Sequence, residues 1–92
     1  MLESKVIIIT GAAGRIGSSA AIELAKMGAK VALADISQDN LEVIKNKILK
    51  YTHKSNLLVS KTNITSESDI DNLILKTKNR FSKITAAVHC AY

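Results

Sequence analysis

Apolar residues in this chain alternate between short continuous runs and longer segments with helical spacing. Four runs, at 5–9, 30–35, 56–60 and 84–91, show little polar alternation, which is typical of parallel strands buried on both faces. Between the runs, apolar positions recur every three or four residues, as they do on the buried side of an amphipathic helix. The pattern predicts four strands that alternate with three helices.

The ends of the three helices are marked by residues that commonly cap helices. Gly28 is placed to end a first helix over 16–28, and Ser37 can accept a hydrogen bond at the start of a second. Ser66, with Asp69 three residues later, is typical of a capping box before a third helix. The apolar positions of the three helices are Ile16, Ala20 and Leu24; Leu41, Ile44, Ile48 and Tyr51; and Ile70, Leu73, Ile74 and Phe81.

The order of elements, β-α-β-α-β-α-β, predicts an α/β fold with a parallel sheet, because helical crossovers between strands are right-handed. The expected strand order is 3-2-1-4, the N-terminal half of a Rossmann-type doubly wound sheet formed by residues 1–92 as one domain. In this order two helices cover one sheet face and the third covers the other alone. The fourth strand would then leave an apolar edge. We therefore expect the N-terminal piece of a longer enzyme, or a truncated gene product.

The first strand runs into a glycine-rich segment, "VIIITGAAGRIG", at residues 6–17. Thr10 closes the apolar run, and Gly11, Gly14 and Gly17 follow at intervals of three. Glycines between a strand and a helix let the backbone turn tightly and approach a pyrophosphate, which the helix N-terminus attracts. The segment therefore predicts a dinucleotide-binding loop.

Two charged residues bear on which dinucleotide would bind. Asp35 ends the second strand 18 positions after Gly17 (35 minus 17), close to the usual interval of about 20. Its carboxylate could accept bonds from the adenosine ribose and repel a 2′-phosphate, which favours NAD; alternatively, it only caps the second helix. Arg15 could pair with phosphate oxygens, including a 2′-phosphate, which leaves NADP open, or it is an exposed arginine on the first turn.

The net charge of +5 brings nucleic-acid binding into consideration. However, the lysines are scattered, and aromatic residues, which would stack on bases, make up only 3% of the chain. The charge pattern therefore favours lysine-rich solvated faces over nucleic-acid binding.

Cysteine usage and the N-terminal residues bear on the compartment. A single cysteine, Cys90, excludes an internal disulfide and favours a reducing environment. With His53 and His89 as the other candidate ligands, a metal site is not expected. Four apolar residues before Thr10 are too few for a signal-peptide core or a membrane span. We expect a cytoplasmic protein that binds no membrane.

The segment 10–17 resembles the nucleotide loop of the short-chain dehydrogenase/reductase family, and the resemblance extends in order over the whole chain. Its glycines follow the T-G-x-x-G-x-x-G spacing of the family's extended members, with Arg15 where shorter members carry glycine. The resemblance implies cofactor contacts by the loop residues Thr10, Gly11, Gly14, Arg15, Ile16 and Gly17.

Two further segments are similar to family motifs. The pair Asn63-Ile64 stands where the family usually has Asp-Val or Asp-Ile against the adenine; Asn63 could keep that role through its amide oxygen, or only shape the turn. His89-Cys90-Ala91-Tyr92 matches the motif after the fourth strand best at His89 and Ala91, which implies that they line the adenosine ribose and support the sheet. From their chemistry alone, His89 and Cys90 are expected to be packing residues.

The family's catalytic Ser or Thr, and its Tyr with Lys four positions later, follow its fourth strand, and none can be placed in this chain. Three hypotheses follow. The chain is the cofactor-binding half of an NAD(P)-dependent oxidoreductase, whose full-length form would take a small-molecule substrate and is expected to be a homo-oligomer. Alternatively, it is a stand-alone, non-catalytic dinucleotide-binding module, or a fragment that completes its sheet with a partner chain.

Overall fold

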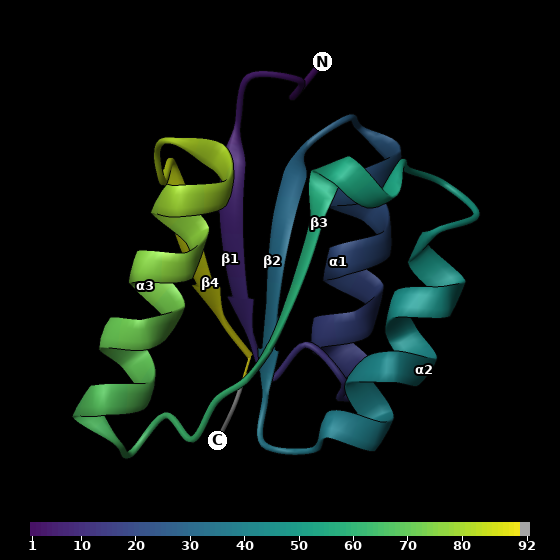
Figure 1. Cartoon of the computed structure of the whole chain (residues 1–92). Coiled ribbons are helices and arrows are strands. Elements are labelled where there is room, and N and C mark those ends of the chain that lie inside the picture. The colour runs from purple at the N-terminus through teal and green to yellow at the C-terminus, as the bar shows by residue number, and fades with distance from the viewer. Residues whose placement is uncertain (91–92) are drawn as a thin grey trace.

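The computed structural model describes residues 1–90, and in this range helices and parallel strands alternate as predicted (Figure 1). A short 3-10 helix, η1, precedes the third strand. The elements are β1 (Val6–Thr10), α1 (Arg15–Lys26), β2 (Lys30–Asp35), α2 (Gln38–Ile48), η1 (Lys54–Asn56), β3 (Leu57–Lys61), α3 (Glu67–Phe81) and β4 (Ala86–His89).

The four strands form one parallel sheet in the order β3-β2-β1-β4, which confirms the predicted topology. In the register of this sheet, Ile9 of β1 pairs with Leu33 of β2 and with Val88 of β4. Because all strands run the same way, their carboxyl ends and the loops that follow them meet at one edge of the sheet, at the bottom of Figure 1. In open α/β sheets this edge is where ligands bind.

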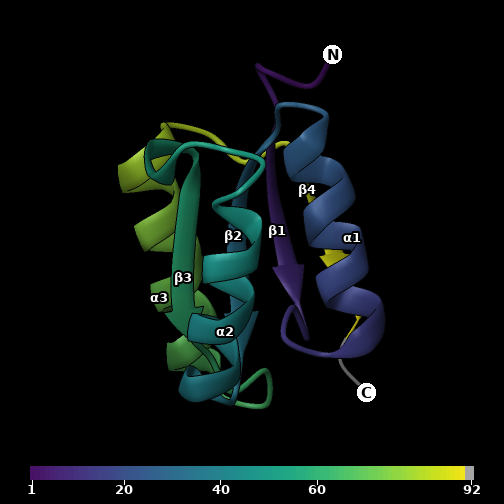
Figure 2. The same ribbon diagram turned by 90° about the vertical axis from the view of Figure 1, so that its right-hand side faces the viewer.

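Helices cover the sheet on both faces. Helix α1 packs on β1 and β2 and α2 on β2 and β3, whereas α3 packs on β2 and β3 from the opposite face. Figures 1 and 2 show α1 and α3 on opposite sides of β1. The larger core cluster, which includes Ile9, Leu33 and Leu41, lies under α1 and α2. The smaller one joins Leu73 of α3 to Ile8 and to two alanines of β2.

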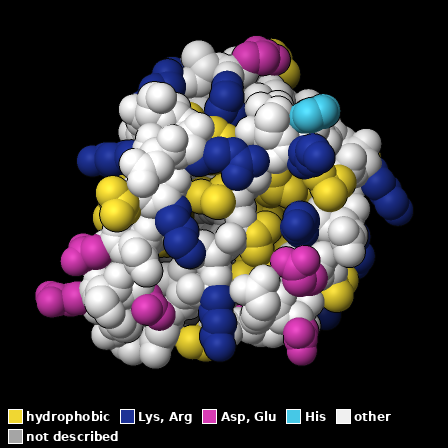
Figure 3. Space-filling view, viewed as in Figure 1, with side chains coloured by type: hydrophobic (Ala, Val, Ile, Leu, Met, Phe, Trp, Pro, Cys, Tyr) yellow, Lys and Arg dark blue, Asp and Glu magenta, His cyan; other side chains and the backbone are white. Residues whose placement is uncertain are grey.

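The face under α3 is less completely covered than the other, as the strand order predicts. All five residues of β1 are buried, but all four of β4 are exposed although their sequence is mostly apolar. A largely apolar cavity of about 440 Å³ lies between α3 and the strands β1 and β4. Figure 3, in which β3 is nearest the viewer as in Figure 1, shows further apolar side chains at the surface between α3 and α2, with Lys and Arg side chains around them.

In α1 the buried positions differ from the predicted ones by one residue. Gly17, Ala21 and Ala25 face the sheet, while Ile16 is 65% exposed. The prediction from apolar spacing was wrong here because the start of α1 lies against the loop after β1 at Gly17, where a Cβ would overlap the carbonyl group of Gly11. Ile16 points instead into the cleft described below.

In α2 the predicted stripe is confirmed at Leu41, Ile44 and Ile48, which are all buried. Tyr51, the fourth predicted member, lies beyond the end of the helix and is 48% exposed. Its ring packs instead under the ammonium of Lys26, 4.7 Å from the ring centre.

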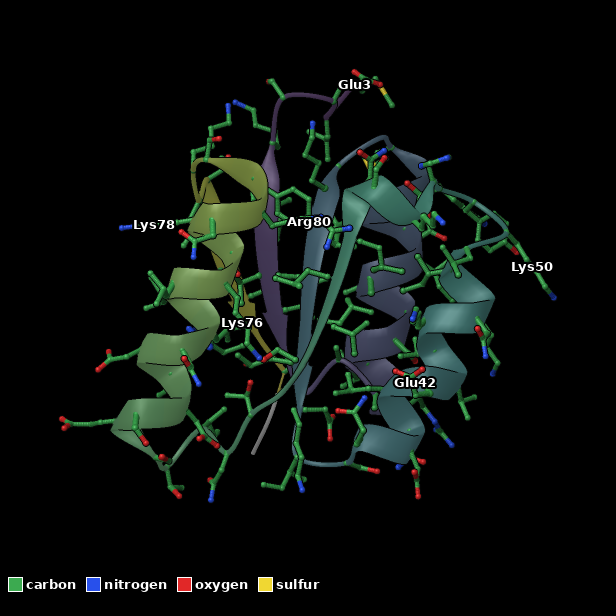
Figure 4. All side chains as sticks on the ribbon, in the orientation of Figure 1. Glu3, Glu42, Lys50, Lys76, Lys78 and Arg80 are labelled. Atoms are coloured by element: carbon green, nitrogen blue, oxygen red, sulfur yellow. The ribbon has the colours of Figure 1, made fainter. Side chains whose placement is uncertain are left out.

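Lysine and arginine side chains lie mainly on the surface. Lys50 and Lys78 point away from the molecule, whereas Arg80 turns across the sheet face towards β3 (Figure 4). Its guanidinium donates a hydrogen bond of 3.0 Å to the carbonyl oxygen of Lys54 in η1. Among residues 1–90, every helix is too short or too polar to cross a membrane.

Candidate functional site

The glycine loop between β1 and α1 turns back on itself at the carboxyl edge of the sheet. Gly11 has a φ of 67°, in the left-handed region that favours glycine, and the Gly14 N–H donates to the Gly11 carbonyl oxygen over 3.1 Å. A Cβ on Gly17 would overlap that same carbonyl oxygen and would lie 2.9 Å from the Cα of Ala12. Gly17 therefore allows α1 to begin directly against the loop.

The N-terminus of α1 is uncapped, unlike those of the other two α-helices. Ser37 and Ser66 each accept a backbone N–H at the start of α2 and α3, and acidic residues stand in both first turns. At α1 no side chain from the described residues caps the helix, and its first turn has no acidic residue. The first intrahelical hydrogen bond is from Ser18 to Gly14, so the N–H groups of residues 15–17 precede it. These donors and the positive end of the helix suit an anion.

Asp35 lies beside the glycine loop and makes two hydrogen bonds with backbone groups. One carboxylate oxygen accepts from the N–H of Ala13 and the other from the N–H of Ser37, each over 3.1 Å. Next to these bonds, the N–H of Ala12 donates to the carbonyl oxygen of Ala34 over 3.1 Å. The loop is thus tied to the end of β2 at two consecutive residues.

A cleft of about 700 Å³ opens at this edge, between the glycine loop, the end of β2 and the segment after β3. This volume lies in the usual range for small-molecule sites. The cleft is lined by Gly11, Gly14, Arg15, Ile16, Gly17, Asp35, Ile36, Thr62, Asn63, Ile64 and Cys90.

Of the predicted cofactor contacts within residues 1–90, all but two come together here. Thr10 and His89 line the smaller apolar cavity on the α3 side, where the Thr10 hydroxyl lies 3.1 Å from Nδ1 of His89. Thr62 and Ile64 border both cavities. The predicted contact Ala91 lies outside the described residues.

Sequence analysis missed three residues of the cleft: Ile36, Thr62 and Cys90. Ile36 is 58% exposed although it is large and apolar, and an apolar residue directly after Asp35 in a turn was a usable signal. Thr62 is buried and carries no signal in the sequence. Cys90, expected as a buried packing residue, is half-buried and free, since it follows the exposed strand β4.

Asn63 is already engaged within its own turn. Its amide oxygen accepts from both the N–H and the hydroxyl of Thr65, over 2.9 and 2.7 Å. Its own N–H donates to the carboxylate of Asp69 over 2.9 Å. Asp69 therefore closes the turn before α3 rather than bonding back to Ser66, so that only the serine half of the predicted capping box forms.

The donor set of the cleft is suited to an organic anion rather than a metal ion. Within residues 1–90, no three His, Cys, Asp or Glu side chains gather closely enough to hold a metal. The cleft instead combines free backbone N–H groups, one carboxylate and the exposed side chains of Ile16, Ile36 and Ile64. Such a mixture of amide donors, a carboxylate and flat apolar surface matches the phosphates, ribose and base of a dinucleotide.

This chain belongs to the short chain dehydrogenase family, whose model matches residues 5–91. Among curated relatives, it is 36% identical over 90 residues to an uncharacterised oxidoreductase of Staphylococcus haemolyticus, and 30% identical over 80 residues to levodione reductase of Leifsonia aquatica. These alignments cover 98% and 87% of the chain but 37% and 30% of the two relatives. The chain therefore spans about a third of the length of the relatives that it matches.

Solved structures show the same fold. The crystal structure of levodione reductase superposes with a TM-score of 0.88 at 28% identity. The superposition covers 95% of this chain and 34% of the levodione reductase chain. A xylitol dehydrogenase structure with bound NAD+ gives a TM-score of 0.86 at 26% identity, over 94% of this chain and 32% of the xylitol dehydrogenase chain. A 3-ketoacyl-(acyl-carrier-protein) reductase from Brucella melitensis, complexed with NADH, gives 0.84 at 30% identity. Similar folds in this family thus hold nicotinamide dinucleotides.

Proposed function

We propose that this chain binds a nicotinamide dinucleotide in the cleft, as the cofactor-binding half of an oxidoreductase. The observation that carries the proposal is the meeting of the uncapped α1 N-terminus, the glycine loop and Asp35 in one cleft. When bound, the nicotinamide supplies hydride transfer to or from an alcohol or carbonyl substrate. The names of the two relatives, an oxidoreductase and a reductase, agree with this chemistry.

In this proposal each part of the cleft binds one part of the cofactor. The N–H groups of residues 15–17 receive the pyrophosphate, and Gly14 lets it approach the backbone. Asp35 accepts hydrogen bonds from the adenosine ribose, and Asn63 and Ile64 lie against the adenine. NAD is the preferred dinucleotide because a 2′-phosphate would face the Asp35 carboxylate, although Arg15 offers it a cation in the same cleft.

The chain by itself is expected to bind the cofactor without catalysing the reaction. Within the 92 residues given, the family's tyrosine with a lysine four positions later has no counterpart, because Tyr51 is followed at that interval by Ser55 and Tyr92 is the last residue. The proposal is therefore tested by binding. Isothermal titration calorimetry of the 92-residue chain should show one site for NAD and a weaker one for NADP. A chain that is folded by circular dichroism but binds neither dinucleotide would contradict the proposal.

Substitution of Asn63 by aspartate tests the adenine contact. The aspartate can still accept from Thr65 with one oxygen, while its second oxygen replaces the amide NH2 and becomes an acceptor for the adenine amino group. One additional hydrogen bond is worth about 0.7 kcal/mol, so the Kd for NAD should fall about threefold. Asn72→Asp, on the exposed side of α3, is the control for the added charge. An unchanged or higher Kd for Asn63→Asp alone would argue against this contact.

A further inference from the structure

We propose that Asp35 also holds the glycine loop in its anion-binding form before any cofactor binds. This inference rests on the proposed function, since it concerns the same cleft. Beyond its proposed contact with the ribose, Asp35 would also set the affinity of the pyrophosphate site, through a contact within the protein. Asp35 is in this sense a positioning residue for the loop.

The supporting contact joins residues 22 positions apart. The Asp35 carboxylate accepts from the N–H of Ala13 across the gap between β2 and the loop, and this contact is partly shielded from water. The other hydrogen bonds that shape the loop are between backbone atoms: Ala12 to Ala34, and Gly14 to Gly11. Asp35 is therefore the side chain that fixes the loop between these two backbone bonds.

The direction of the Ala13 N–H decides which donors remain for a ligand. Because this N–H is turned towards Asp35, the phosphate must be bound by the next donors along the chain, those of residues 15–17. Ala13 lies two residues before the helix begins, so its orientation sets the direction in which the backbone enters α1. Without the carboxylate, the segment from Ala13 to Gly14 would lose the one side-chain hydrogen bond that it receives within residues 1–90, and would sample other conformations.

Electrostatics alone predicts the opposite effect, which makes the inference testable. A carboxylate in the same cleft repels an anion, so its removal should strengthen the binding of a phosphate compound if charge were its only contribution. If Asp35 positions the loop, its removal should weaken the binding of an anion that has no ribose. Inorganic pyrophosphate is such a probe.

Asp35→Ser separates the two contacts of the carboxylate. A serine hydroxyl can still accept from the N–H two residues ahead, which preserves the turn to Ser37, but it is too short to reach Ala13. Asp39→Ser, in the exposed first turn of α2, makes the same charge change away from the loop. Asp35→Asn is a second variant of almost unchanged shape, whose single oxygen can serve only one of the two N–H groups.

The experiment measures amide hydrogen exchange in the ligand-free 92-residue chain by NMR, followed by titration with inorganic pyrophosphate. In Asp35→Ser the Ala13 amide should exchange at least tenfold faster than in the parent, and the Kd for pyrophosphate should rise about threefold. Asp39→Ser should leave the exchange rate unchanged. If Asp35→Ser does not fold, Asp35→Asn replaces it. Faster exchange of the Ala13 amide, or of the Ser37 amide because the single oxygen stays bonded to Ala13, supports the inference, and unchanged exchange of both amides overturns it.

Two results would overturn the inference: an unchanged Ala13 exchange rate in folded Asp35→Ser, or tighter pyrophosphate binding by that variant. Failure of the proposed function would look different. In that case the parent chain would bind neither NAD nor pyrophosphate, while the exchange rate of Ala13, measured without ligand, would still decide whether Asp35 holds the loop.

Discussion

Replacing Gly17 by alanine is expected to destabilise the chain by about 2 kcal/mol and to abolish dinucleotide binding. In the interior of an ordinary helix, replacing glycine by alanine raises the free energy of unfolding by about 1 kcal/mol, so the effect expected here is the opposite. The reason is that the added Cβ would overlap the carbonyl oxygen of Gly11 and lie 2.8 Å from its carbonyl carbon. These are backbone atoms, so relief requires that the loop moves away from α1. Urea unfolding gives the loss of stability, and calorimetry with NAD gives the loss of binding.

Gly14→Ala is the matched control for this prediction. A Cβ on Gly14 would meet only the carbonyl oxygen of Gly11, at 3.4 Å, which is an ordinary contact, and the φ of −77° suits any residue. This variant should therefore unfold within about 0.5 kcal/mol of the parent, the range of ordinary surface substitutions. It should still bind NAD more weakly, because the methyl group would lie where the pyrophosphate approaches the backbone. If Gly14→Ala and Gly17→Ala lowered the free energy of unfolding equally, the loop would not be packed against α1 as described.

Asp35→Ala should weaken NAD binding about thirtyfold and NADP binding much less. Hydrogen bonds from the ribose hydroxyls to a carboxylate contribute about 2 kcal/mol, which corresponds to that factor. For NADP the loss is offset because a 2′-phosphate is no longer repelled. Looser attachment of the loop would add an equal loss for both dinucleotides, so the ratio of their Kd values is the quantity that reports on the ribose.

The measurement is calorimetric titration of both dinucleotides into the parent, Asp35→Ala and Asp39→Ala. Asp39 is exposed in the first turn of α2, and its replacement should leave the ratio unchanged. If Asp35→Ala weakened NAD and NADP by the same factor, Asp35 would have no role in recognising the ribose.

The fold could be predicted because its signals are local. Continuous apolar runs, the caps Ser37 and Ser66, and a helix in each connection were sufficient for the parallel sheet and its order. Predictions that depended on how closely a helix packs against a neighbouring loop were less successful. Ile16 was expected on the buried stripe of α1, but the contact between Gly17 and Gly11 rotates the helix so that Ile16 faces the cleft.

The candidate site could be predicted where its residues belong to a recognisable motif and directly follow a strand whose place in the sheet is known. The loop glycines and Asp35 follow neighbouring parallel strands, so their meeting at one edge follows from the topology. Ile36 and Thr62 could not be found in this way, because they line the cleft through turns whose shape the sequence does not reveal. The occupation of the Asn63 amide oxygen by Thr65 depends on side-chain geometry in a single turn.

The uncapped start of α1 has a consequence for how the chain responds to its ligand. Ser37 and Ser66 each satisfy one backbone N–H at the start of α2 and α3, whereas no side chain of the described residues does so at the start of α1. A bound pyrophosphate would act as the missing cap, so that ligand binding and the completion of a helix become one event. The midpoint of thermal unfolding would then rise with ligand concentration, and the chain would be most resistant to heat and proteolysis when its cofactor is plentiful.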